Sequence, residues 1–60
     1  MLSKVNTEIQ TSVTRLGDKD ILITAWIGDL DLGQRTYRNT TVKKALRMAT
    51  DYIRINGSLH

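Results

Sequence analysis

The residues that could serve as a general base, a nucleophile or a metal ligand are few in this chain of 60 residues. It contains no cysteine, and its one histidine, His60, is the last residue of the sequence. A catalytic base must be held in place by a third group, whereas a terminal residue is usually mobile. So small a chain also leaves little room for a pocket that separates the pKa values of two carboxylates. We therefore expect no enzyme activity, no cofactor and no small-molecule substrate.

A short pattern, Gly-Asp-x-Asp, occurs twice, at residues 17–20 and 28–31. Neighbouring carboxylates can bind a cation, but a calcium loop needs further oxygen ligands at fixed offsets and a distal Glu, which the sequence lacks. Asp and Gly are also typical of hairpin turns. We interpret both copies as turns and expect no metal site.

The basic residues gather in the second half of the chain. Residues 35–60 contain six Lys and Arg side chains against one Asp, a net charge of +5, whereas residues 1–34 sum to −2. The six cations are Arg35, Arg38, Lys43, Lys44, Arg47 and Arg54. Such asymmetry indicates an anionic partner, either DNA or RNA or an acidic protein surface. The alternative is an ordinary solvated face, because Lys and Arg are good helix formers.

Four of these cations belong to a helix that the sequence predicts over Thr41–Ile55. Apolar residues recur there with the helical period and form one wide stripe, made of Val42, Ala45, Leu46, Met48, Ala49, Tyr52, Ile53 and Ile55. Side-chain oxygens in residues 39–41 can cap the first turn, and Asn56-Gly57 supplies residues that tolerate a left-handed cap. The cations lie on the opposite side of the helix, where they face solvent or a partner.

The residues before the helix predict strands. Lys4–Thr14 alternates between a side with Val and Ile and a side with short polar residues, which indicates a half-buried strand. Asp20–Ile27 is apolar on both sides, which indicates a central strand covered twice. Gly28–Gly33 predicts a turn or a short excursion, and Gln34–Arg38 a weaker strand at an edge.

Trp26 and Leu22 lie on the side of the second strand that the helix cannot cover. One interpretation is that a loop packs over Trp26, with Leu30 or Leu32. The other is that Leu22, Trp26 and Leu30 form an interface with a partner or with another copy of the chain, because Trp is favoured at the centre of interfaces. Both interpretations stay open at the level of sequence.

These elements predict one α+β domain over residues 1–60, in which three antiparallel strands form a meander and one C-terminal helix packs on it (βββα). A chain of this size buries only about 60% of its unfolded surface, and no disulfide supports it. We therefore expect a homo-oligomer or a complex with another protein.

No stretch approaches the roughly 20 apolar residues that span a bilayer, and the first ten residues lack a signal core. We expect a cytoplasmic protein, of bacterial or phage origin.

Two functions of different classes follow from these features. The first is a protein-binding module or inhibitor that masks a partner's surface, based on the small size and on Trp26. The second is a small nucleic-acid-binding regulatory protein that uses the basic helix face, or a sheet face that carries Asn6, Gln10, Ser12 and Thr14 into a groove. The strand and helix order is similar in outline to small DNA-binding domains of some plant transcription factors and phage integrases. Lys43-Lys44-Ala45 at the helix start resembles double-stranded-RNA-binding domains, which have a further helix before the strands. These likenesses are of layout and assign no family.

Overall fold

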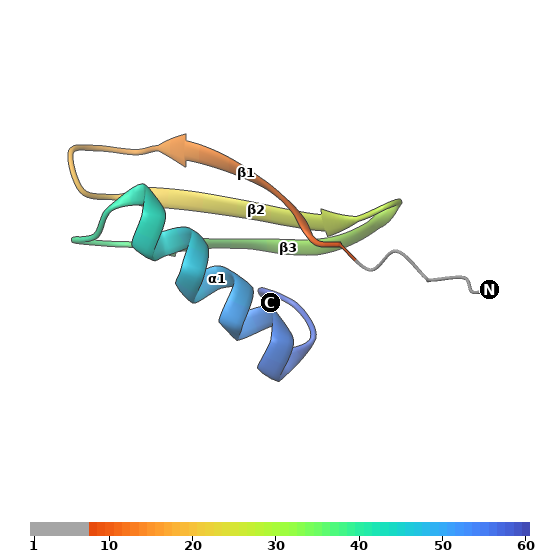
Figure 1. The fold of residues 1–60 in the computed structure, drawn as a ribbon. Coiled ribbons are helices and arrows are strands. Elements are labelled where there is room, and N and C mark those ends of the chain that lie inside the picture. The colour runs from red at the N-terminus through yellow and green to blue at the C-terminus, as the bar shows by residue number, and fades with distance from the viewer. Residues whose placement is uncertain (1–7) are drawn as a thin grey trace.

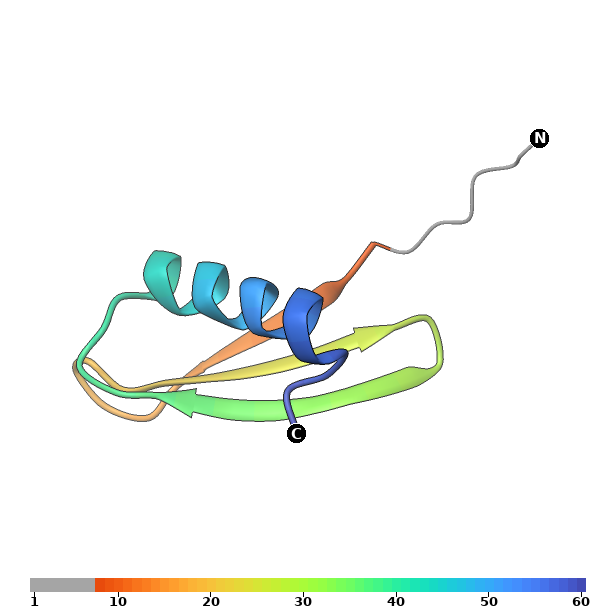
Figure 2. The ribbon, with the colours of Figure 1, turned by 90° about the horizontal axis from the view of Figure 1, so that it is seen from below.

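The fold is a three-stranded antiparallel sheet with one helix packed on it, and a computed structural model describes residues 8–60 (Figures 1 and 2). Its elements are β1 (Gln10–Arg15), β2 (Ile21–Ile27), β3 (Leu30–Tyr37) and α1 (Val42–Asn56). The sheet order is β1-β2-β3, so each strand pairs with its neighbour in sequence. This arrangement confirms the predicted βββα fold. The first four residues of the predicted first strand, 4–7, lie outside the described residues.

The pairing of β1 with β2 confirms the predicted alternation of side chains. The predicted half-burial of this strand is wrong over Gln10–Arg15, because all six residues of β1 are exposed. Val13 lies opposite Ile23, and Thr11 lies opposite Ala25, on the side that faces α1. Ser12 lies opposite Thr24 on the other side. Residues directly opposite in an antiparallel pair point to the same face. The register therefore sorts the strand residues into one face under the helix and one face away from it.

The second hairpin is tighter than the sequence analysis expected. The predicted excursion over Gly28–Gly33 is wrong, because the turn contains only Gly28 and Asp29, and β3 already begins at Leu30. Gly28 has φ +56°, a conformation that glycine adopts at little cost in a two-residue hairpin turn. A register shift opposite the stretch from Thr24 to Trp26 then brings Leu32 into the core.

The helix begins and ends at the signals that the sequence predicts. The Thr41 hydroxyl accepts a hydrogen bond from the Lys44 backbone N–H at 3.3 Å. Gly57 has φ +89°, and its N–H donates to the Ile53 carbonyl at 2.7 Å. These contacts satisfy backbone groups that a helix end leaves free.

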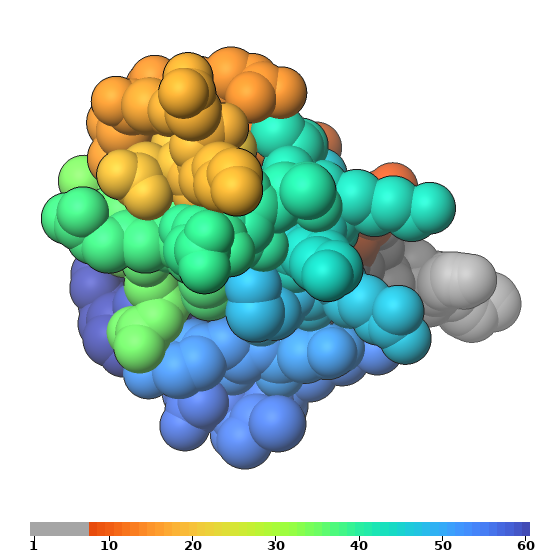
Figure 3. All heavy atoms as spheres, turned by 90° about the vertical axis from the view of Figure 1, so that its left-hand side faces the viewer, coloured from red at the N-terminus to blue at the C-terminus, as the bar shows by residue number. Residues whose placement is uncertain are grey.

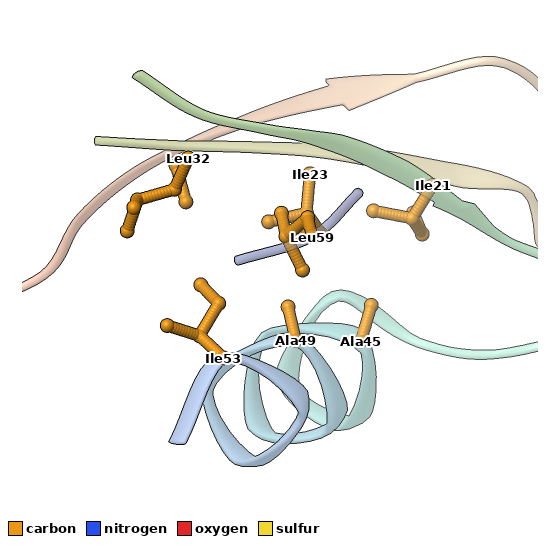
Figure 4. Close-up of a cluster of buried hydrophobic side chains, with 8 residues drawn as sticks. Ile21, Ile23, Leu32, Ala45, Ala49, Ile53 and Leu59 are labelled. Carbon is orange, nitrogen blue, oxygen red and sulfur yellow. The ribbon is translucent and has the colours of Figure 1, made fainter. Parts of the chain in front are cut away.

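Small residues on α1 allow it to lie close to the sheet. Ala45 and Ala49 are fully buried against the face of β2 that carries Ile21 and Ile23 (Figure 4). Leu59 fills the remaining space between the helix and the sheet and is only 1% exposed. Its backbone N–H donates to the Leu32 carbonyl at 2.7 Å, so the tail after α1 runs against the outer edge of β3. The sequence analysis did not identify Leu59 as a core residue.

Leu59 should therefore contribute strongly to stability. We expect Leu59→Ala to lower the free energy of unfolding by roughly 2–4 kcal/mol, because it removes buried methyl groups and leaves a cavity. Ile55→Ala is the matched control, since Ile55 is 81% exposed and its truncation should change stability by less than about 0.5 kcal/mol. Urea unfolding of both variants measures the difference. Equal stability of the two variants would show that the tail does not dock as described.

The phenol of Tyr37 is an unsatisfied polar group in the interior. Its oxygen is buried and finds no hydrogen-bond partner within residues 8–60. Burial raises the pKa of Tyr37 above its ordinary value, partly offset by the nearby Arg35 cation. Above pH ~10 the unfolded phenol loses its proton first, so the folded state binds more protons and the free energy of unfolding falls as the pH rises.

We expect Tyr37→Phe to leave stability at pH 7 unchanged or to raise it by up to about 1 kcal/mol, because no hydrogen bond is lost. At alkaline pH the same variant should also lose less stability than wild type, because the part of the fall in the free energy of unfolding that Tyr37 causes is then absent. Urea unfolding at neutral and at alkaline pH tests both expectations. Tyr52→Phe is the control: it removes a phenol that donates to the His60 carbonyl at 3.5 Å, and it should keep most of that loss, because burial raises the pKa of Tyr37 more than the nearby Tyr52 does. A clear destabilisation by Tyr37→Phe at pH 7 would contradict the unpaired state of its hydroxyl.

Candidate functional site

The side of the sheet that faces away from α1 carries the candidate site. Figure 1 shows the helix on one side of the three strands. The cross-strand register places a central row from β2, flanked by short polar side chains of β1 and β3, on the other side. We call this surface the open face; it comprises Gln10, Ser12, Thr14, Leu22, Thr24, Trp26, Asp31, Gln34 and Thr36.

The open face carries two apolar residues on its central strand and a single charge among the residues around them. Leu22 and Trp26 are half-buried, on either side of Thr24. The Thr24 hydroxyl lies 3.4 Å from the Gln34 side-chain oxygen across the strand pair. The one charged member, Asp31, already accepts a hydrogen bond from the Gly33 N–H at 2.8 Å. Since 25% of the residues in the chain are charged, this face is depleted in charge.

The structure places Leu22 and Trp26 on the same face of β2, on either side of Thr24, but Leu30 lies on the other face. Leu30 pairs with Ile27, which places it on the opposite side of the sheet, at the hairpin tip, where it is 61% exposed. Leu32 is buried in the core under the helix. Neither leucine covers Trp26, so the interpretation in which one of them packs over it does not describe this structure.

The six candidate cations do not form one surface. Arg35 lies over the ring of Tyr52, with 4.3 Å between the guanidinium carbon and the ring centre. Arg38 pairs with Asp20 at 3.7 Å near the β1–β2 turn. The four helix cations, Lys43, Lys44, Arg47 and Arg54, are exposed. None of these four forms an ion pair with another of the described residues, 8–60.

An open cavity of about 370 Å³ lies where the β1–β2 turn meets the start of α1. Arg15, Lys19 and Lys44 line it, together with Asp18 and residues 39–42. Figure 3, viewed from this end, shows the turn next to the segment that leads into the helix. A hydrogen bond of 2.9 Å from the Thr40 N–H to the Lys19 carbonyl ties the two together. The sequence analysis missed Arg15 and Lys19 because they belong to the half of the chain with negative net charge.

Within residues 8–60 no three His, Asp or Glu side chains come together as metal ligands would. No helix in the same range has the length and apolar character needed to cross a bilayer. Comparison with protein-family models, with curated proteins and with solved structures finds no match to this chain.

Proposed function

We propose that this chain is a small protein-binding module that masks a partner's surface with the open face of its sheet. The observation that supports this function is the composition of that face, where Trp26 and Leu22 lie on the central strand and Asp31 is the one charged residue. Depletion of charge at the core and enrichment of aromatic residues distinguish protein interfaces from the rest of a surface. The expected cytoplasmic location stays a prediction.

The energetics of the open face favour docking over continued exposure. Burying a large apolar side chain that water still touches contributes up to about 1.5–3 kcal/mol. Most neighbours of Trp26 and Leu22 are Ser and Thr, whose short side chains have few rotamers to lose on binding. The backbone beneath them is already fixed by pairing on both sides of β2. Little ordering is therefore needed when a partner arrives, which improves affinity.

The residues of the open face also indicate what kind of surface a partner would present to it. A sheet face whose one carboxylate already accepts a hydrogen bond offers few charges for a charged protein patch or a phosphate backbone to pair with. It suits a protein surface that is weakly charged, with hydrogen-bonding groups opposite the Thr and Gln side chains and an apolar recess for Trp26. The affinity for such a partner should depend little on salt.

The test compares wild type with Trp26→Thr, which removes the indole but keeps a residue that suits a strand. Met48→Ala is the matched control, because Met48 is an exposed apolar residue on α1. Partners that are captured from extracts of the native host by wild type and by Met48→Ala, but not by Trp26→Thr, are then purified and titrated by calorimetry. We expect Trp26→Thr to weaken binding at least tenfold, with little change between low and physiological salt. Identical binding by all three proteins would overturn the proposal.

A second candidate is nucleic-acid binding by the outer side of α1. Lys43, Arg47 and Arg54 fall within a narrow stripe of the helix, and none has an acidic partner within residues 8–60. Such a row suits contacts to phosphates that carry no sequence information.

Fluorescence anisotropy with labelled DNA and RNA, at low and at physiological salt, tests this second candidate. Binding by the helix predicts a steep loss of affinity with salt, and Arg47→Ala should reduce the salt slope by about one. Trp26→Thr should leave this binding unchanged. The absence of binding at low salt, where the electrostatic attraction is largest, would exclude the second candidate.

A further inference from the structure

The two edges of the sheet differ in how they are covered. The outer edge of β3 is met by the C-terminal tail through the hydrogen bond from Leu59 to Leu32. The outer edge of β1 has no backbone partner within residues 8–60. Figure 1 shows β1 at this margin of the sheet, away from α1 and the tail. An unpaired strand edge is a template for another strand.

β1 has few of the devices that usually protect an edge strand. It contains no proline and no lysine, its one charged residue is Arg15 at its end, and its register with β2 runs without a bulge from Gln10 to Arg15. All six of its residues are exposed, including Val13, which is 38% exposed although Ile23 opposite it is fully buried. Proteins normally block such an edge with Pro, a bulge or inward charges. Apart from Arg15 at its end, β1 therefore leaves its outer edge open to another strand.

The hydrogen-bond pattern shows which groups of β1 point outward. The Leu16 N–H donates to the Asp20 carbonyl at 2.9 Å, so this opposed pair is a hydrogen-bonded one. Such pairs alternate along an antiparallel ladder. Thr14 and Ser12 therefore bond to β2, whereas the backbone groups of Thr11, Val13 and Arg15 face the free edge.

We propose that β1 pairs with β1 of a second copy of this chain, antiparallel and about a two-fold axis at Val13. In this register Val13 lies opposite Val13 of the other copy, and each Thr11 lies opposite an Arg15. All outward N–H and C=O groups of these three residues then find partners. No like charges face each other, and the two exposed valines cover one another.

The pairing closes after two copies. Each chain offers one free edge, and the tail obstructs the other, so the contact produces a dimer rather than a fibre. The dimer is a single six-stranded sheet with both helices on the same side. The two open faces join on the other side, which leaves Leu22 and Trp26 available. This inference does not depend on the proposed function.

Cysteine cross-linking tests the register, because the chain has no cysteine of its own. In the proposed dimer Ser12 lies opposite Thr14 in a non-hydrogen-bonded pair, whose Cα atoms are about 4.5 Å apart. This separation suits a disulfide. A mixture of Ser12→Cys and Thr14→Cys chains should form a mixed disulfide dimer under mild oxidation. Met48→Cys, on the exposed side of α1, is the control. Cross-linking no greater than for Met48→Cys would overturn the register.

Sedimentation measurements over a range of concentrations test the dimer itself. Val13→Lys places two ammonium groups opposite each other and should weaken dimerisation at least tenfold, whereas Met48→Lys should not. Val13 is exposed in the single chain, so the substitution leaves the core intact. Trp26→Thr should remain dimeric, which separates this inference from the function of the open face. A wild type that is monomeric throughout, or a dimer lost through Trp26→Thr but not Val13→Lys, would overturn the proposal.

Discussion

The close approach of α1 to β2 is the contact on which the rest of the structure depends. Ala45 and Ala49 have side chains small enough to bring the helix backbone near the sheet, where Ile21 and Ile23 pack against them. Residues 8–60 contain only this one helix, and it covers one face of the sheet. Leu59 completes the core because two alanines leave space that a larger helix residue would fill.

This one-sided core explains why the two faces differ in chemistry. β2 is apolar on both sides, and the side without a helix keeps Leu22 and Trp26 among Ser, Thr and Gln. The Ser, Thr and Gln side chains around them form hydrogen bonds with water and so keep that face hydrated. They are not the long charged side chains that would obstruct a docking partner. The positive charge collects instead on the outer side of α1. The molecule thus separates an uncharged surface from a basic one.

Much of the fold could be predicted because it follows from local rules. The period of two in β1 and β2 and the caps at Thr41 and Gly57 each act over a few residues. Features that depend on distant contacts could not be predicted. Leu59 is a single apolar residue after a helix cap, and only the space left by Ala45 and Ala49 makes it part of the core.

The candidate site was predictable to a similar extent. The alternation of β2 placed Leu22 and Trp26 on one side, and this requires no knowledge of the neighbouring strand. The position of Leu30 depends instead on the length of the turn at Gly28. Because this turn contains two residues, Leu30 lies on the side of the sheet opposite to Leu22 and Trp26. Arg15 and Lys19 reach the helix start only because the β1–β2 turn folds next to it, and no sequence pattern encodes that contact.

The most direct test of the open face as a docking surface is fluorine NMR of chains labelled with 5-fluorotryptophan. The chain has a single tryptophan, so the spectrum reports on Trp26 alone. The shift of this resonance between H₂O and D₂O measures contact with solvent, in the free chain and in the chain saturated with its purified protein partner. The account predicts that this solvent shift falls sharply in the complex. An unchanged solvent shift in a chain that is demonstrably bound would show that the partner docks elsewhere.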